Sequence, residues 1–459
     1  MYFSVNYGTL YDFTMIQNVL GTDSQESQEL MSNQLLLMII GLGFIPSIIV
    51  LRLKVEYPSI FEASYKNVLT AFFAILIGLF SVFPFYNEFN SFVRSNNVIL
   101  RYSLLPISPL RVLFKSVSPF LNKKPVEKIL LDKNASITDA NIGPFTRPLA
   151  LVVIIGETAR DKSFRLQDEG LRSQEETLLN RHNLFYFSNF WSCGTSTLQS
   201  VPCMFSIFPR AEYDPIMNWK FENVAELIQR VGYSTSWTNN NSSCKDVCKN
   251  LESIPIIKKN AIQFVQDEQF YDEALVYDLA KRIRKKDQDQ VIFLHQIGSH
   301  GPAYFRRSPD SYKILQPVCE SIDFVNCERS EIRNAYNNTI LYTKTVIGKA
   351  IEQLKEINNQ YATLLIYVSD HGESTGEKGL YLHGTPYYIA PDEQTHIPAM
   401  FWMNEHYIND RGIDKSCLSA KLENRFSHDN FSHTLIGILD IKTSHYKKAL
   451  DILASCRRS

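Results

Sequence analysis

Two long uncharged stretches near the start of the chain restrict its fold more than any other feature of the sequence. The first is LLLMIIGLGFIPSIIVL (residues 35–51) and the second is NVLTAFFAILIGLFSVFPFY (residues 67–86). Each comes close to the roughly 20 apolar residues that a helix needs to cross the hydrocarbon core of a bilayer. Buried helices of a soluble protein are the alternative, but such helices normally keep a polar face, which both stretches lack over several turns. We therefore predict two transmembrane helices.

The connection between these stretches predicts their orientation. It carries Arg52, Lys54 and Lys66, and short basic connections stay on the cytoplasmic side of a membrane. Residues 1–34 and everything after Tyr86 then lie on the outer side, which in a bacterium is the periplasm. Residues 1–34 are not a signal peptide, because they include four acidic residues and lack a basic start. The sequence thus predicts an inner-membrane protein whose larger part is periplasmic.

The eight cysteines indicate an oxidising compartment. Structural zinc is the alternative, but the Cys-x2-Cys spacing typical of such sites is absent and the gaps differ from pair to pair. We expect disulfides, in agreement with the periplasmic location. The cysteines fall into three close pairs and a leftover pair that could form a fourth: Cys193 with Cys203, Cys244 with Cys248, Cys319 with Cys327, and Cys417 with Cys456.

The composition bounds the size of the core and the class of partner. With 459 residues, 45% of them hydrophobic, the chain has enough apolar material for a large core and, as a loose expectation, two or three domains. A formal net charge of −1 provides no basic field to hold nucleic acid. The densest basic run, KRIRKK at residues 281–286, is short and typical of a solvated helix face. Nucleic acid is therefore not expected as a partner.

Changes in composition divide the chain into three parts. Residues 1–86 contain the outer N-terminal segment and both membrane stretches. Residues 87–146 hold five prolines among basic and apolar residues, and we interpret them as a bridging helix and linker. Within this part, an amphipathic membrane-contacting helix at residues 104–121 and a plain linker are both open. Residues 147–459 are expected to form one periplasmic domain.

Beyond residue 147, apolar runs alternate with helical patterns and end in polar residues. Runs of this kind are typical of strands buried on both faces, and hence of a mostly parallel sheet covered by helices. Ligands bind such α/β sheets beyond the carboxyl ends of the strands, so we expect the functional site at that edge. Four runs show the pattern: LALVVII (149–155) before Gly156 and Glu157, YSTSW (233–237) before three asparagines, QVIFL (290–294) before His295, and TLLIYV (363–368) before Ser369, Asp370 and His371.

The predicted edge carries the residue types of a catalytic metal site. Glu157, Asp370 and His371 supply two carboxylates and an imidazole, a set that suits zinc with an open fourth position. Each residue alone also has a structural explanation, such as helix capping for Glu157 or a turn for Asp370. Their combination at the ends of apolar strands favours a functional site.

A loop rich in hydroxyl groups lies between the first two cysteines. CGTSTLQSVPC (residues 193–203) contains Thr195, Ser196, Thr197 and Ser200. An alcohol is a weak nucleophile that a metal ion can activate, and a disulfide would reduce the entropy lost in presenting it. Residue types alone do not select one of these hydroxyls, and a purely stabilising disulfide around turn residues is the alternative.

Five motifs of the predicted periplasmic domain carry a family resemblance. They are GETAR (156–160), CGTST (193–197) with SVPCMFS (200–206), NNS (240–242), HQIGSHGP (295–302) and DHGES (370–374). These motifs resemble those of the phosphoethanolamine transferases of Gram-negative bacteria, which are membrane enzymes of the alkaline phosphatase and sulfatase superfamily. The best-known members modify lipid A and confer polymyxin resistance. The resemblance extends from about Tyr7 to the C-terminus.

The resemblance implies a role for each site residue. Thr197 is the expected nucleophile, and Glu157, Thr197, Asp370 and His371 are the expected ligands of one zinc ion. A second set resembles the residues that bind the phosphoryl group and, in some members, further zinc: Asn241, Lys245, His300 and His383. In this set, Lys245 could neutralise phosphate and an imidazole could protonate a leaving alkoxide. For His295, a place in the substrate pocket and a plain strand end remain equally open.

The outer segment MIQNVLGTD (residues 15–23) resembles the family's periplasmic loop that approaches the lipid donor. Asn18, Thr22 and Glu26 match its polar positions, and their spacing of four predicts one face of a helix. Glu26 could pair with the ammonium of an ethanolamine head group, and an ordinary solvated helix face is the alternative. Family members generally begin with further transmembrane helices, five in all. The chain therefore resembles an N-terminally shortened member, which puts its access to lipid in question.

The resemblance implies a zinc-dependent transfer in two steps. Phosphoethanolamine would pass from phosphatidylethanolamine to Thr197 and then to a lipid A phosphate, in a monomeric enzyme of the inner membrane. A core sugar of lipopolysaccharide or a periplasmic glucan is the alternative acceptor. A membrane-anchored hydrolase of the phosphatase or sulfatase type and an inactive relic are the alternatives of other classes.

Overall fold

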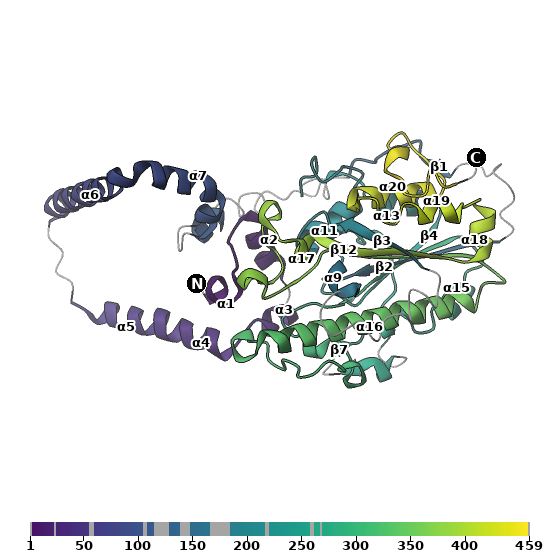
Figure 1. The fold of residues 1–459 in the computed structure, drawn as a ribbon, viewed down its shortest axis with the longest axis horizontal. Coiled ribbons are helices and arrows are strands. Elements are labelled where there is room, and N and C mark those ends of the chain that lie inside the picture. The colour runs from purple at the N-terminus through teal and green to yellow at the C-terminus, as the bar shows by residue number, and fades with distance from the viewer. Residues whose placement is uncertain are drawn as a thin grey trace.

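The molecule consists of a sheet flanked by helices, from which two helical arms extend to one side (Figure 1). The computed structural model describes residues 2–22, 24–54, 59–103, 108–113, 128–137, 147–165, 184–215, 220–257, 261–266 and 269–457. The three short helices α1 (Tyr2–Tyr7), α2 (Phe13–Gly21) and α3 (Ser24–Glu29) precede the first arm.

The first predicted membrane stretch forms an unbroken helical arm. It consists of α4 (Asn33–Ile39), a π-helical turn η1 (Ile40–Phe44) and α5 (Ile45–Arg52). Proline in a helix lacks the backbone N–H of the regular hydrogen bond and its ring clashes with the preceding turn, so Pro46 accounts for the widened turn just before it. The arm begins at Ser32, whose side chain accepts a hydrogen bond from the backbone N–H of Leu35.

The second predicted stretch is also helical but extends further than the sequence indicated. It comprises α6 (Ile60–Val82), the 3₁₀ turn η2 (Phe83–Phe85) and α7 (Tyr86–Ser103). The helix does not end at Tyr86, because Pro84 is accommodated in the short η2 turn and the chain then resumes a helix with more polar residues.

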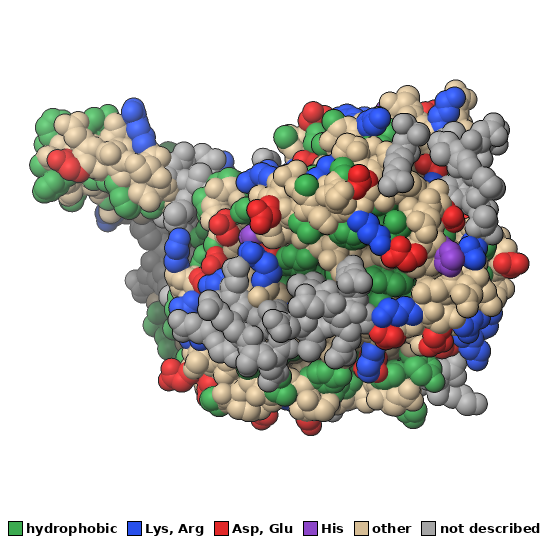
Figure 2. All heavy atoms as spheres, turned by 45° about the vertical axis from the view of Figure 1, so that its right-hand side comes forward, with side chains coloured by type: hydrophobic (Ala, Val, Ile, Leu, Met, Phe, Trp, Pro, Cys, Tyr) green, Lys and Arg blue, Asp and Glu red, His purple; other side chains and the backbone are tan. Residues whose placement is uncertain are grey.

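Both arms have the length and composition of membrane spans. The two segments are Asn33–Arg52 and Ser64–Asn96, and the most apolar part of each has no residue buried inside the protein. A projecting helical arm is covered largely by hydrophobic side chains, whereas charged groups are scattered over the main body (Figure 2). Two long apolar helices therefore lie where the membrane helices were predicted. Of residues 104–121, for which a membrane-contacting helix and a plain linker were both left open, residues 108–113 are described and helical, and the remainder lies outside the described residues.

The predicted α/β architecture is confirmed by a sheet of eight strands in the order β13-β3-β12-β9-β2-β8-β4-β5. All neighbours are parallel except that β12 runs antiparallel to both β3 and β9. The four predicted strands correspond to β2, β4, β8 and β9, whereas the antiparallel β12 is a feature that the sequence pattern did not predict. The strands are β2 (Leu149–Gly156), β3 (Phe185–Trp191), β4 (Ser234–Asn239), β5 (Glu252–Ser253), β8 (Gln290–His295), β9 (Ala362–Ser369), β12 (His396–Met403) and β13 (Phe426–Ser427).

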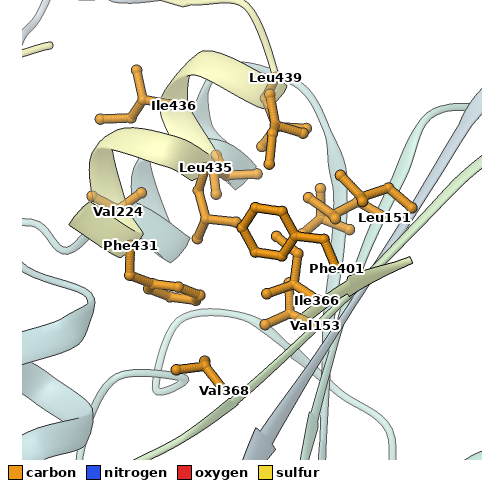
Figure 3. Packing of buried hydrophobic residues seen from close by; sticks show 14 of the residues in the cluster. Leu151, Val153, Val224, Ile366, Val368, Phe401, Phe431, Leu435, Ile436 and Leu439 are labelled. Atoms are coloured by element: carbon orange, nitrogen blue, oxygen red, sulfur yellow. The ribbon is translucent and has the colours of Figure 1, made fainter. Parts of the chain in front are cut away.

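Helices cover both faces of this sheet, which explains why β2 is apolar at every position. The long helix α16 (Arg329–Lys355) lies along one face, and α13 (Val224–Arg230) and α20 (His428–Ile438) lie on the other (Figure 1). Successive side chains of a strand point to opposite faces, so Val152 packs on the α16 side and Val153 on the α20 side. On the latter side the strand residues Leu151, Val153, Ile366, Val368 and Phe401 face Val224, Phe431, Leu435 and Leu439 (Figure 3).

All four cysteine pairs form disulfides, as predicted, and the alternative of structural zinc at these cysteines is excluded. The bonds join Cys193 to Cys203, Cys244 to Cys248, Cys319 to Cys327 and Cys417 to Cys456. The first closes the loop of hydroxyl residues, over a separation of 10 residues.

Removing the Cys193–Cys203 bond should affect stability and activity together. Replacing both cysteines by serine should lower the free energy of unfolding by ~3 kcal/mol, because the closed loop no longer restricts the unfolded chain. It should also lower kcat, because the loop presents its hydroxyls less rigidly. Thermal unfolding and turnover of the detergent-solubilised chain test this. The double replacement of Cys417 and Cys456, 39 residues apart, is the control, which should lose at least as much stability but keep kcat.

Candidate active site

The predicted site residues meet at one edge of the sheet, beyond the carboxyl ends of its parallel strands. This edge is where the loops of an open α/β sheet form ligand sites. The strands bring together residues that are far apart in the chain: Glu157 after β2, Thr197 in the helix that follows β3, Asn241 after β4, His300 after β8, and Asp370 with His371 after β9.

Thr197 is the first residue of α11 (Thr197–Met204) and contacts the acidic cluster directly. Its Oγ1 lies 2.9 Å from Glu157 Oε2, 3.1 Å from Glu157 Oε1 and 3.4 Å from His371 Nε2. The neighbouring hydroxyl of Thr195 instead donates to the carbonyl of Thr385 at 2.7 Å. The geometry therefore distinguishes Thr197 from Thr195, which residue types alone could not do.

Glu157, Asp370 and His371 form a fully buried cluster that fits a metal ion. One ligand atom from each lies within 4.8 Å of the others, and His371 Nε2 is 3.3 Å from both Glu157 Oε1 and Asp370 Oδ2. Asp370 Oδ1 accepts two backbone N–H groups, but Oδ2 is buried without a hydrogen bond to any described residue. His371 Nδ1 is 2.9 Å from the carbonyl of Gly372, which directs Nε2 toward the cluster as a potential ligand.

The pKa values of this cluster reflect two buried carboxylates close together. Burial, followed by the negative charge of Glu157, raises the pKa of Asp370 to about 7. Burial also opposes the ionisation of Glu157, but the hydrogen bond and charge of His371 outweigh it and lower the pKa of Glu157. Burial opposes protonation of His371, yet the charges of Asp370 and Glu157 raise its pKa to about 9. A divalent cation would neutralise this concentration of negative charge.

A second group of possible ligands lies beside the first. His371, Glu373 and His383 place a ligand atom each within 4.8 Å of one another. His383 Nδ1 is 2.8 Å from Glu373 Oε2, and the His383 ring centroid is 5.5 Å from that of His300. Glu373 was not among the residues predicted from the sequence, although its position two residues after His371 in the DHGES motif was the available signal.

Asn241 and Lys245 occupy different positions relative to this cluster. The Nδ2 of Asn241 donates to Glu157 Oε2 at 2.6 Å and to the carbonyl of Gln296 at 2.9 Å. Because both of its amide hydrogens have protein acceptors, Asn241 orients Glu157 in this arrangement. Lys245 lines the same pocket as Thr197, and its Nζ lies 3.2 Å from Ser242 Oγ.

Comparison with known proteins identifies the family. The model described as phosphoethanolamine transferase EptA/EptB matches residues 1–119, and the sulfatase model matches residues 150–441. Phosphoethanolamine transferase EptA of Escherichia coli K12 is 34% identical over 466 residues, which cover 100% of this chain and 83% of that protein. The chain belongs to the phosphoethanolamine transferase family. Phosphatidylethanolamine transferase Mcr-1 of Escherichia coli is also 34% identical, over 97% of this chain and 82% of that protein.

Structure comparison agrees over the whole chain of this phosphoethanolamine transferase. The integral membrane phosphoethanolamine transferase EptA of Neisseria meningitidis superimposes with a TM-score of 0.92 and 32% identity, covering 100% of this chain and 85% of that one. The soluble domain of the same meningococcal enzyme matches 73% of this chain with 35% identity and a TM-score of 0.68. The C-terminal periplasmic domain of phosphoethanolamine transferase EptC of Campylobacter jejuni matches 71% of this chain with 35% identity and a TM-score of 0.60. The predicted location, an integral membrane protein whose catalytic domain is periplasmic, is confirmed.

The outer N-terminal segment forms one wall of the transferase pocket. Asn18 and Thr22 line the pocket together with Thr197, His300 and His383. Asn18 Oδ1 is buried without a hydrogen bond to any described residue. The Thr22 hydroxyl donates to the carbonyl of Asn18 at 2.8 Å.

The prediction that Asn18, Thr22 and Glu26 share one helix face is wrong. α2 ends at Gly21, Thr22 has extended backbone angles, and Glu26 belongs to the separate helix α3. Glycine favours the end of a helix because it costs entropy to hold in a helical conformation. The side chain of Glu26 lies outside the described residues.

His295 lies behind the pocket. Its side chain has no exposed surface, it is absent from the pocket lining, and its Nδ1 is 2.8 Å from Asn239 Oδ1. Burial lowers the pKa of His295 to about 4. Of the two roles left open by the sequence, this position indicates the strand end and not substrate contact.

His428 links the loop that carries Thr197 to the strand that precedes Asp370 and His371, and it should make the fold sensitive to acid. Its Nδ1 accepts from the backbone N–H of Cys193 at 3.0 Å, and its Nε2 is 3.0 Å from the carbonyl of Ser369. Burial lowers the pKa of His428 to about 3. The unfolded chain therefore binds a proton below about pH 6.5 that the folded protein does not.

Stability from His428 is thus fully present above about pH 6.5 and is lost as the pH falls toward about 3. Between these values the free energy of unfolding should fall by ~1.4 kcal/mol per pH unit for this one proton. The variant His428→Asn keeps an acceptor for Cys193 but cannot titrate, so its slope should be smaller by that amount. Denaturant unfolding of both proteins across this pH range tests the difference, and equal slopes would contradict it.

Proposed function

We propose that this enzyme transfers phosphoethanolamine from phosphatidylethanolamine to a phosphate of lipid A, through a covalent intermediate on Thr197. The contact of Thr197 Oγ1 with Glu157 and His371 carries the proposal. The pocket in front of Thr197 is walled by the outer segment that leads into the first membrane helix, which fits a donor drawn from the membrane. The related meningococcal enzyme is described as a lipooligosaccharide phosphoethanolamine transferase, which supports a glycolipid acceptor.

Zinc is the proposed cofactor, held by Glu157, Thr197, Asp370 and His371. Two carboxylates, a hydroxyl and an imidazole match the oxygen and nitrogen ligands that catalytic zinc accepts, and Asp370 Oδ2, which makes no hydrogen bond to a described residue, supplies a donor atom. When bound, zinc would lower the pKa of the Thr197 hydroxyl and stabilise negative charge on the phosphoryl oxygens. The group of His371, Glu373 and His383 is a candidate for a second ion.

In the first half-reaction, Thr197 Oγ attacks the phosphorus of the donor. The Oγ–P bond forms, the bond from phosphorus to the diacylglycerol oxygen breaks, and the proton that the Thr197 hydroxyl gives up is balanced by the one that this oxygen takes as it leaves. Lys245 lies where its positive charge can neutralise a phosphoryl oxygen, and His300 and His383 line the same space as acids for the leaving alkoxide.

In the second half-reaction, an oxygen of the acceptor phosphate attacks the same phosphorus. The Oγ–P bond breaks and Thr197 recovers a proton, so the enzyme returns to its starting state. The acceptor enters the pocket only after diacylglycerol leaves, because in-line displacement requires both to occupy the face of the phosphorus opposite Thr197 Oγ.

The test is transfer by the purified full chain in detergent micelles that contain labelled phosphatidylethanolamine and lipid A. Labelled lipid A and diacylglycerol in equal amounts, lost on chelation and restored by zinc, are the expected products. If free phosphoethanolamine were released in the absence of acceptor as fast as the group is transferred in its presence, the chain would instead be a hydrolase. A second assay offers intact lipopolysaccharide as the acceptor. If its core sugar became labelled and its lipid A phosphates did not, the proposed acceptor would be the core sugar instead of lipid A.

A further inference from the structure

A buried ion pair joins the outer N-terminal segment to the catalytic domain. Arg307 Nη2 donates to Glu29 Oε2, between residues 278 positions apart in the chain. Arg307 is 4% exposed and Glu29 is 5% exposed. Two charges are expensive to bury unless they are paired and hydrogen-bonded, so this contact fixes one particular arrangement of the two segments.

Arg307 connects the pair to a residue of the active site. Its Nε donates to the backbone carbonyl of His300 at 2.9 Å, and its Nη1 donates to Gln269 Oε1 at 2.7 Å. Gln269 completes the network, because its Nε2 donates to Glu29 Oε1 at 3.1 Å. One guanidinium group therefore holds both Glu29 and the loop that carries the His300 imidazole into the pocket.

Glu29 occupies a position that couples the pocket wall to the membrane. It is the last residue of α3, three residues before Ser32, the cap of the first membrane helix. The preceding helix α2 packs against the loop that carries His383 so closely that a Cβ at Gly384 would lie 2.8 Å from Met15 Cε. The same segment places Asn18 and Leu30 in the pocket lining.

We infer that Glu29 and Arg307 are positioning residues for the transfer reaction, whose ion pair locks the outer segment over the pocket and at the same time fixes the His300 loop. This inference rests on the proposed function for its kinetic consequences. Closure of the donor site and placement of His300 then occur together, since the same guanidinium group makes both contacts. A misplacement of catalytic groups by about 1 Å can cost about 100-fold in rate.

Substitutions of Glu29 and of Arg307 should differ in their effects on kcat and KM. Glu29→Gln removes the charge that holds the outer segment, so KM for phosphatidylethanolamine should rise and kcat should fall. Arg307→Lys keeps the positive charge beside Glu29 but cannot bond His300 and Glu29 at once, so kcat should fall with little change in KM. We expect losses in kcat/KM between about 10-fold and 100-fold for Glu29→Gln.

Turnover of phosphatidylethanolamine micelles and hydrogen exchange of the full chain test the inference. The control is Glu222→Gln, which breaks the bond of another buried glutamate to an arginine, the exposed Arg230, at 2.6 Å; neither residue lines the pocket. Faster exchange in both residues 13–30 and residues 296–307 of Glu29→Gln, with the kinetic split above and wild-type kinetics in the control, is the expected result.

Two results would overturn the inference. One is wild-type kcat and KM in both Glu29→Gln and Arg307→Lys. The other is an equal kinetic loss in the Glu222→Gln control, which would make the ion pair a general source of stability. If the wild-type chain transferred nothing, the proposed function would fail, and the joint change in hydrogen exchange at the two segments would still decide whether the pair couples them.

Discussion

Replacing Thr197 by alanine should abolish transfer, with kcat reduced by about 10⁴-fold or more, because no other group can form the covalent intermediate. The same substitution should remove the phosphoethanolamine adduct that the wild-type chain acquires from phosphatidylethanolamine in the absence of acceptor. Peptide mass mapping of residues 184–215 measures the adduct, and diacylglycerol release measures the rate. The alanine variant should fold normally, because it removes only a hydroxyl that faces the acidic cluster.

The neighbouring hydroxyls provide matched controls for this prediction. Thr195 Oγ1 is engaged with the carbonyl of Thr385, so Thr195→Ala should form the adduct with a moderate loss of rate. Thr197→Ser keeps a hydroxyl at the same atom and should retain measurable transfer. An adduct on Thr195 or Ser196 in the Thr197→Ala protein, or full activity of that protein, would contradict the assignment of the nucleophile.

The sequence predicts the sheet and its functional edge because both depend on local patterns. The run at residues 149–155 is apolar throughout, and only a strand covered on both faces requires that. Glu157, Asp370 and His371 then meet because each directly follows a parallel strand. The antiparallel strand β12 was not predictable in the same way, because its direction is set by pairing with β3 and β9 and not by its own residues.

Features that depend on distant contacts were also beyond the sequence. Residue types leave Thr195 and Thr197 equivalent, and only the three-dimensional approach of Glu157 separates them. The outer segment ends a helix at Gly21 although the spacing of its polar residues suggests a longer one. The pairing of Glu29 with Arg307 has no local signal at all, since it joins two segments through burial and charge.

Replacing Asp370 by asparagine should eliminate bound zinc and lower transfer by about 10³-fold or more, because the ligand loses the charge that holds the ion. Metal analysis of the purified protein and the transfer assay measure the two effects. The control is Asp451→Asn, which alters a buried aspartate paired with Arg457 at 3.2 Å, far along the chain from the pocket residues. That control should lose stability and keep its zinc.

The stability of the Asp370 variant should change in the opposite sense from that of the control. The pKa of Asp370 is raised to about 7, so the metal-free wild-type protein binds a proton there that the unfolded chain releases near pH 4. Its stability should therefore fall as the pH rises from about 4 to about 7. Asp370→Asn should remove this fall and leave the metal-free protein more stable than wild type at pH 8.

Added zinc should stabilise only the wild type, by binding the folded state. Equal zinc-dependent stabilisation of both proteins would mean that the ion binds elsewhere, and the assignment of this cluster as the zinc site would then be wrong.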